Sequence, residues 1–108
     1  MTGKIVVLTT CASAREAETI ARALVEKRLA ACVNILPGVR SIYRWCGAIE
    51  DGAEVLLLIK SRRNLFDELR AEIEKVHSYE TPEVLALDVT AVSAAYLSWL
   101  DAELKPEA

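Results

Sequence analysis

Residues 77–83 are the stretch of this chain whose residue types and spacing could carry chemistry. The segment begins with His77, the single histidine of the protein, and Tyr79 and two glutamates follow within six positions. Imidazole and carboxylate groups on one loop can ligate a metal, move a proton or hold a small polar ligand. Pro82 favours an extended conformation for the residue before it, so the segment is predicted to end a helix and to enter the apolar strand that follows.

Four further side chains extend this candidate set. Glu83, at the entrance of the predicted strand, is either a ligand or base or a solvent-exposed charge. Lys60 ends an apolar segment, where it either holds an anionic ligand, pairs with Glu83 or extends its amine to solvent at the sheet rim. Tyr43 and Trp45, two residues apart, share one face of a predicted strand, and they either pack in a core or subunit interface or line a cleft.

The three cysteines, Cys11, Cys32 and Cys46, form no C-x-x-C pair. Their odd number and spacing argue against a disulfide scaffold and against a structural zinc site. We interpret them first as reduced structural thiols, with a soft-metal or redox role for Cys11 or Cys46 as the alternative. Cys11 stands just before a predicted helix N-terminus, a position that lowers the pKa of a thiol.

Composition limits the class of protein. The 108 residues are predicted to form a single domain, 1–108. Hydrophobic residues make up 53%, a high fraction for so small a domain, so part of the apolar surface is expected to be hidden by self-association. The formal charge of −3, with acids and bases mixed, argues against a nucleic-acid partner. The apolar run at 5–8 is too short for a signal peptide or a membrane span, so we expect a soluble, cytoplasmic protein without a membrane partner.

The sequence lacks a P-loop, a G-x-G-x-x-G, an H-E-x-x-H and a G-x-S-x-G motif. A single histidine also makes a His-rich metal site impossible within one chain, so a chelate needs Cys, Glu, Asp or a neighbouring subunit. An enzyme with His77 and Glu83 as acid–base partners is the least favoured hypothesis, and we expect no catalytic residues.

Hydrophobic periodicity gives the order of the expected elements: strand 4–10, helix 13–29, strand 30–45, hairpin tip 46–52, strand 53–60, a helix from Asn64 to near His77, strand 83–90 and a helix after Ser93. Ser13 and Glu16 form a capping box, and a bend or bulge is expected at residues 37–38. Asn64 is the predicted cap of the second helix, and residues 105–108 are expected to fray. This order predicts an α+β, ferredoxin-like βαββαβ fold: an antiparallel sheet with helices on one face, plus a C-terminal helix.

The second and third strands are too long for a small sheet, so their hairpin is expected to overhang it. An exposed hairpin that carries Tyr43 and Trp45 is an aggregation hazard unless another chain covers it. The overhang therefore predicts an oligomer.

Residues 30–38, 41–45, 54–60, 77–83 and 96–100 together resemble the CutA divalent-cation tolerance proteins, in the order of that family. The resemblance covers nearly the whole chain. It implies a ferredoxin-like fold with a long hairpin between the second and third strands, assembled as a homotrimer. It also implies a cytoplasmic protein linked to tolerance of copper and other divalent metals, with no established enzymatic reaction.

The resemblance also implies inter-subunit clefts, lined by the positions that match Tyr43, Trp45, Lys60, His77, Tyr79 and Glu83. In the family, copper is associated with a cysteine near the end of the first strand and with adjacent histidines at the loop. The matching positions here hold Thr9 and Val76, so the ligand set differs. Cys11 with His77 would substitute if the fold brings them together.

The sequence therefore supports one leading hypothesis and one alternative. The leading hypothesis is a homotrimer that binds Cu(II) in inter-subunit clefts, with His77 as the principal ligand and Glu83 or Cys11 assisting, because copper tops the affinity order for such donors. The ion is not expected to be required for folding. The alternative is a trimeric module without metal that binds a small anion or metabolite, with Lys60 at the anion and Tyr43, Trp45 and Tyr79 lining the cleft.

Overall fold

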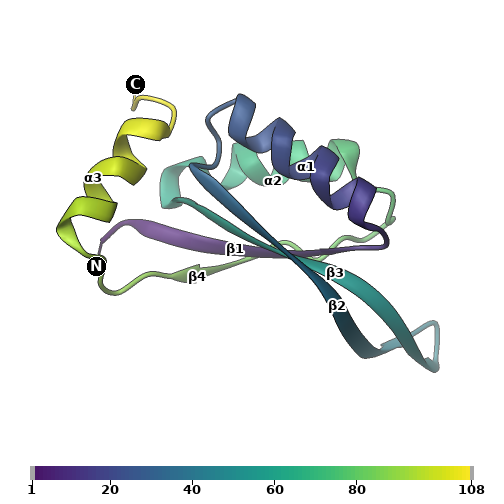
Figure 1. The fold of residues 1–108 in the computed structure, drawn as a ribbon. Helices are drawn as coiled ribbons and strands as arrows, with labels where there is room; N and C mark the ends of the chain where they lie inside the picture. The colour runs from purple at the N-terminus through teal and green to yellow at the C-terminus, as the bar shows by residue number, and fades with distance from the viewer. Residues whose placement is uncertain (1, 108) are drawn as a thin grey trace.

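The computed structural model describes residues 2–107. Its elements are β1 (Lys4–Cys11), α1 (Ala14–Glu26), β2 (Cys32–Trp45), β3 (Ala48–Arg62), a 3-10 turn η1 (Arg63–Leu65), α2 (Phe66–Val76), β4 (Leu85–Asp88) and α3 (Ala94–Glu103). The strands form one antiparallel sheet in the order β2-β3-β1-β4. Helices α1 and α2 lie side by side over one face of the sheet, and α3 lies at its end (Figure 1). The predicted α+β, ferredoxin-like fold with a C-terminal helix is confirmed.

The hydrophobic core lies between the sheet and these two helices. Alternate residues of β1 and β3 point toward the helices, and Val7, Leu57 and Ile59 are fully buried there. Helix α1 contributes Ile20 and Leu24 at helical spacing. Each fully buried side chain of this size stabilises the fold by about 1.5–3 kcal/mol. These residues belong to one cluster of buried apolar side chains.

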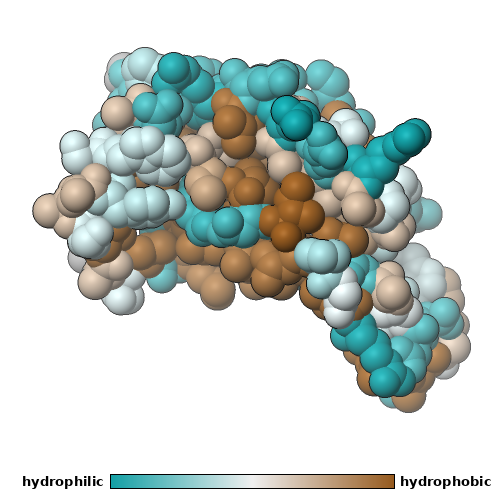
Figure 2. Space-filling view, viewed as in Figure 1, coloured by the Kyte–Doolittle hydropathy of each residue, from teal (hydrophilic) through white to brown (hydrophobic). Residues whose placement is uncertain are grey.

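The opposite face of the sheet, which we call the open face, is also apolar. Leu8 pairs with Leu58 on one side and with Leu85 on the other, so all three side chains share this face. Leu87, also on this face, is 53% exposed. Figure 2 shows a band of apolar side chains below the helices, along the underside of the sheet. Along β1 from Ile5 onward, the residues on the helix face are buried, whereas those on the open face are only partly buried.

Strands β2 and β3 continue beyond the rest of the sheet. Strand β1 leaves β3 at the pair Cys11–Val55, whereas β2 pairs with β3 as far as Trp45–Ala48. Residues 39–54, which we call the hairpin arm, therefore project as a two-stranded ribbon, about 23 Å long at 3.3 Å per residue (Figure 1). The predicted overhang is confirmed.

Two local features shape the hairpin arm. The expected irregularity at residues 37–38 is present as a register shift between Leu36 and Val39, with Gly38 at a φ of 79°. The predicted tip over residues 46–52 is wrong, because only Cys46 and Gly47 separate the paired strands. Both have positive φ, 51° and 80°, which is the backbone that a two-residue hairpin turn requires.

The second helix begins differently from the prediction. Asn64 does not cap it: η1 intervenes, and α2 starts at Phe66 without a side-chain cap. The amide of Asn64 is occupied elsewhere, since its oxygen accepts from Arg62 Nε at 2.6 Å and its nitrogen donates to Glu107 at 2.9 Å. Helix α1 and strand β4 are also shorter than expected, and Ser93 precedes α3 without a capping side-chain bond.

The segment after α3 is anchored rather than frayed. The backbone N–H of Lys105 donates to the carbonyl of Arg28 at 2.8 Å, and its amine pairs with Glu68 at 2.8 Å. Arg62 pairs with Glu107 at 3.4 Å and also donates to the Lys105 carbonyl. The fraying expected for residues 105–107 is therefore wrong, and Ala108 lies outside the described residues.

Candidate functional site

Three potential metal ligands meet where β1 and α2 end and α1 begins. Cys11 is the last residue of β1, Glu16 lies in the first turn of α1, and His77 follows α2 directly. One ligand atom from each lies within 4.8 Å of the others. We call these three residues the ligand cluster. The fold thus brings Cys11 to His77, and it adds Glu16 where the sequence suggested Glu83.

Both ring nitrogens of His77 already have partners. Nδ1 accepts a hydrogen bond from the backbone N–H of Tyr79 at 3.0 Å, and Nε2 lies 2.8 Å from the carbonyl oxygen of Thr10. Because a backbone N–H can only donate, Nδ1 holds the lone pair and Nε2–H donates to Thr10. A metal ion that binds His77 must therefore replace one of these two hydrogen bonds.

Glu16 connects the loop of residues 77–83 to the start of α1 through hydrogen bonds. Ser13 Oγ accepts from the Glu16 N–H at 3.2 Å, as the capping box predicted. The Glu16 carboxylate accepts from the N–H of Ser78 at 2.8 Å and from that of Ala12 at 3.4 Å. Burial raises the pKa of Glu16, but the hydrogen bonds from Ser78 and Ala12 and the nearby His77 together hold it below its usual range. In the sequence, the only signal of this role is the capping box, which places Glu16 five residues after Cys11.

The pKa predicted for Cys11 is wrong in direction. Burial raises the pKa of its thiol to about 11, with further contributions from Glu16 and Glu54, because a thiolate would be poorly solvated and close to two carboxylates. These effects outweigh the lowering of the thiol pKa that the helix N-terminus would cause. The thiol is protonated at neutral pH, so a metal that uses this sulfur must displace its proton.

The reactivity of the thiols tests the burial and the raised pKa of Cys11. At pH 8, Ellman's reagent is expected to modify the exposed Cys46 first and to leave Cys11 unmodified until the protein unfolds. A pKa of about 11 in place of about 9 leaves about a hundredfold less thiolate, before burial restricts access. The Cys46→Ser variant should lose the fast phase. Rapid modification of Cys11 in the folded protein would contradict the burial and the raised thiol pKa of this residue.

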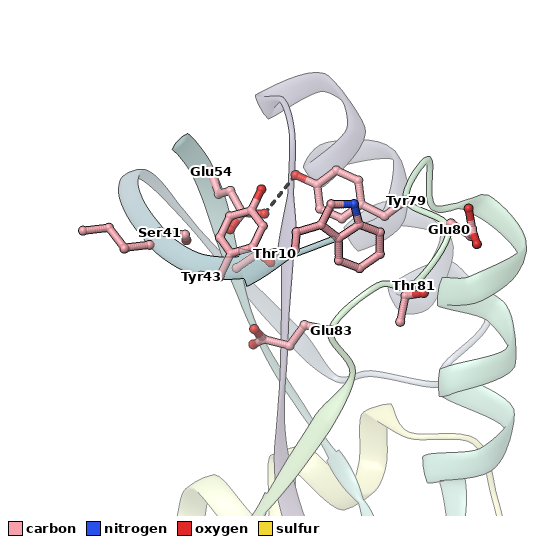
Figure 3. A pocket seen from close by; sticks show the side chains of 10 residues that line it. Thr10, Ser41, Tyr43, Glu54, Tyr79, Glu80, Thr81 and Glu83 are labelled. Carbon is pink, nitrogen blue, oxygen red and sulfur yellow. Dashed lines mark hydrogen bonds between the residues drawn. The ribbon is translucent and has the colours of Figure 1, made fainter. Parts of the chain in front are cut away.

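A second site, which we call the arm pocket, lies between the hairpin arm and the loop of residues 77–83 (Figure 3). It has a volume of about 620 Å³ and is lined by Thr10, Ser41, Ile42, Tyr43, Trp45, Glu54, Tyr79, Glu80, Thr81 and Glu83. The hydroxyl of Tyr79 donates to Glu54 at 2.9 Å, the dashed bond of Figure 3. Burial and this bond raise the pKa of Tyr79, so its hydroxyl remains a donor.

The arm pocket collects four of the residues predicted to form a cleft or site. Tyr43 and Trp45 come from the arm, whereas Tyr79 and Glu83 come from the loop. Glu83 therefore lines this pocket rather than completing the ligand cluster. Sequence reasoning missed Glu54, whose only signal was a carboxylate at the start of an apolar strand.

Lys60 does not line the arm pocket. It lies six residues from Glu54 along β3, or about 20 Å, and pairs in the sheet with Cys32 and Val6. Its amine donates to the side-chain oxygen of Asn34. Within one chain, the predicted anion site between Lys60 and the aromatic residues therefore does not form.

The resemblance matches two further copper-ligand positions to Thr9, which is fully buried, and to Val76, which is partly buried. Thr9 is fully buried on the helix face of β1, and its hydroxyl finds no hydrogen-bond partner among the described residues. Val76 packs against the core at the end of α2.

Of the helices in the described part of the chain, none has the length and apolarity needed to cross a membrane.

Comparison with known proteins agrees with the fold and the motifs. Residues 5–103 match the family described as CutA1 divalent ion tolerance protein. The divalent-cation tolerance protein CutA of Thermus thermophilus is 48% identical over 95 residues, covering 88% of this chain and 92% of that protein. Protein CutA of mouse is 48% identical over 91 residues, covering 84% of this chain; the chain spans only 51% of that longer relative.

Solved structures of related proteins also superpose closely on this chain. The Thermus thermophilus protein superposes with a TM-score of 0.92 at 45% identity, over 94% of this chain and 99% of that one. A protein from Archaeoglobus fulgidus, described as a periplasmic divalent cation tolerance protein CutA, superposes with a TM-score of 0.91 at 38% identity, over 94% and 99%. The fold, the motifs and these relatives together show that the chain belongs to the CutA divalent-cation tolerance family.

Proposed function

We propose that this protein binds a divalent cation, Cu(II) foremost, at the ligand cluster. The observation that carries the proposal is the approach of a sulfur, a carboxylate oxygen and an imidazole nitrogen to within 4.8 Å of one another. Such a mixed donor set suits copper, which binds most tightly among the common divalent metals. Sequestration of the ion would contribute to tolerance, and no catalytic reaction is proposed.

The cluster fits a metal only if it rearranges. Cys11 must lose its proton, and His77 must give up its bond to Tyr79 or to Thr10. We therefore expect binding to release a proton and to move residues 77–83. Glu83 is then a residue of the arm pocket, and it becomes a ligand only if the loop brings it to the cluster.

The proposal includes assembly as a homotrimer in the cytoplasm. The exposed apolar open face and the projecting hairpin arm support self-association, and a threefold assembly is what the resemblance to the family implies. All three cysteines are free, which suits a reducing compartment. In a trimer the hairpin arm would contact a neighbour, and the metal would then lie close to an inter-subunit cleft.

Calorimetric titration of the metal-free protein with Cu(II) tests the metal site. Saturable binding of about one ion per chain is expected, weakened by about tenfold or more in His77→Ala and in Cys11→Ala. Glu80→Gln is the matched control, because Glu80 shares the loop with His77 but lies outside the ligand cluster. Weak, unsaturated heat that persists in His77→Ala would rule out the proposed site.

A further inference from the structure

Cys32 and Lys60 place a thiol and an amine in contact, away from the ligand cluster. The two residues are directly opposite each other in β2 and β3. Lys60 also pairs with Val6, which pairs in turn with Leu87, so both side chains lie on the open face. The Nζ atom of Lys60 is 3.9 Å from the Sγ atom of Cys32. An oxidisable sulfur therefore has a potential nucleophile beside it.

Two neighbouring side chains hold this pair in position. The amine of Lys60 donates to the side-chain oxygen of Asn34, two residues after Cys32 on β2. On α3, at this end of the sheet (Figure 1), burial raises the pKa of Tyr96, and the charge of Cys32 and a hydrogen bond with it raise that pKa further. Among residues 2–107, no carboxylate forms an ion pair with Lys60, so the amine is not drawn away from the sulfur.

We propose that Cys32 and Lys60 form a reversible covalent cross-link when the protein is exposed to hydrogen peroxide. Peroxide oxidises the thiol to a sulfenic acid and is reduced to water. The nitrogen of Lys60 then attacks this sulfur, an S–N bond forms, and the S–O bond breaks as a second water leaves. The ammonium gives one proton to that water and one to solvent. A thiol reductant cleaves the S–N bond and restores both side chains.

Lys60 is the competent partner for an oxidised Cys32 within the chain. A sulfenic acid condenses with a nearby thiol or nitrogen. Cys11 lies on the helix face, across the sheet from Cys32, and Cys46 follows the far end of β2, so neither thiol is within reach. The hydroxyl of Tyr96 stays protonated at neutral pH because its pKa is raised. The amine at 3.9 Å is therefore the expected nucleophile.

The contact is a property of one chain and of its sheet. Opposite residues of antiparallel strands hold their Cβ atoms about 4.5–5.5 Å apart, whatever covers the face. The proposed assembly thus leaves the pair together, and only an oxidant as small as peroxide must reach the sulfur. Because a sulfenamide nitrogen carries no positive charge, the cross-link removes the charge of Lys60 from the open face and ties β2 to β3.

Mass spectrometry of the metal-free protein tests the cross-link. The Cys46→Ser variant, which lacks the exposed thiol, is treated with hydrogen peroxide in the presence of EDTA. We expect its mass to fall by about 2 Da, for the two hydrogens lost, and to return after dithiothreitol. Trypsin should no longer cleave after Lys60, so the peptides 29–40 and 45–62 should remain joined.

Lys60→Arg, made in the same background, tests the role of the amine. It keeps the positive charge, but a guanidinium remains protonated, so the cross-linked fraction should fall at least about tenfold. Lys75→Arg is the matched control, because Lys75 is exposed on α2, and it should cross-link like the parent. The proposal is overturned if Cys32 stays reduced, if it oxidises without joined peptides, or if the reversible mass loss persists in Lys60→Arg.

The cross-link and the proposed metal site can fail separately, since they share no side chain. Cys32→Ser should lose the cross-link and keep Cu(II) binding, whereas Cys11→Ala should do the reverse. Sedimentation of the parent and of Lys60→Arg before oxidation checks that both assemble alike. If they differ, Cys32→Ser and the joined peptides of the parent decide the result.

Discussion

Replacing Ile59 by alanine is expected to lower the free energy of unfolding by about 2–5 kcal/mol, because the residue lies at the centre of the core. It is fully buried on β3 and pairs with Val7 on one side and Val33 on the other. Truncation removes apolar contacts and leaves a cavity that the sheet cannot close. Since a domain of this size is stable by only about 5–15 kcal/mol, much of the variant is expected to unfold at moderate urea.

Urea denaturation at one fixed protein concentration measures this loss, because the proposed self-association would make the apparent stability depend on concentration. Ile49→Ala is the matched control, since Ile49 lies on the same strand but is 67% exposed. We expect it to cost at most about 1 kcal/mol, the scale of strand propensity. Equal losses at the two positions would contradict the burial pattern of β3.

Replacing Leu87 by glutamate is expected to abolish assembly while leaving the single chain folded. Leu87 lies on the open face and is 53% exposed, so a charge there costs one chain little. Buried between copies, the same carboxylate would lose its hydration without a partner, which costs several kcal/mol. By sedimentation velocity, the parent is expected near three times the chain mass of 11.9 kDa, and the variant near that mass itself.

Val25→Glu is the matched control for this experiment. Val25 is 42% exposed, but it lies on α1, away from the open face. The control is expected to remain assembled. A monomeric parent protein would contradict self-association itself, and a trimeric Leu87→Glu variant would show that assembly does not bury this part of the open face.

Much of the fold could be predicted because its signals are local. The spacing of apolar residues places α1, the capping box of Ser13 and Glu16 starts it, and the irregularity after Leu36 follows from a Pro-Gly pair. The errors arise where contacts with distant residues override such local signals. Asn64 has the chemistry of a helix cap, but Arg62 and Glu107 occupy its amide, and a contact with a residue 43 positions away leaves no trace in a short window.

In the loop of residues 77–83, the sequence likewise reveals which side chains are reactive but not which groups they meet. Its chemistry could be recognised because His77, Tyr79 and Glu83 are neighbours in the chain. Tertiary structure then separates them: His77 contacts the end of β1, while Glu83 lines the arm pocket.

The sequence by itself determined the order of the elements, the overhanging hairpin and the segment that carries the reactive side chains, because each depends on residues close together in the chain. Only the tertiary structure decided which distant groups meet. It brought Glu16 to Ser78, 62 positions away, buried Cys11 so that the pKa of its thiol rises instead of falling, and left Lys60 far from the arm pocket. Ligand geometry and pKa depend on solvent exclusion and on charges within a few ångströms, and these are properties of the folded chain.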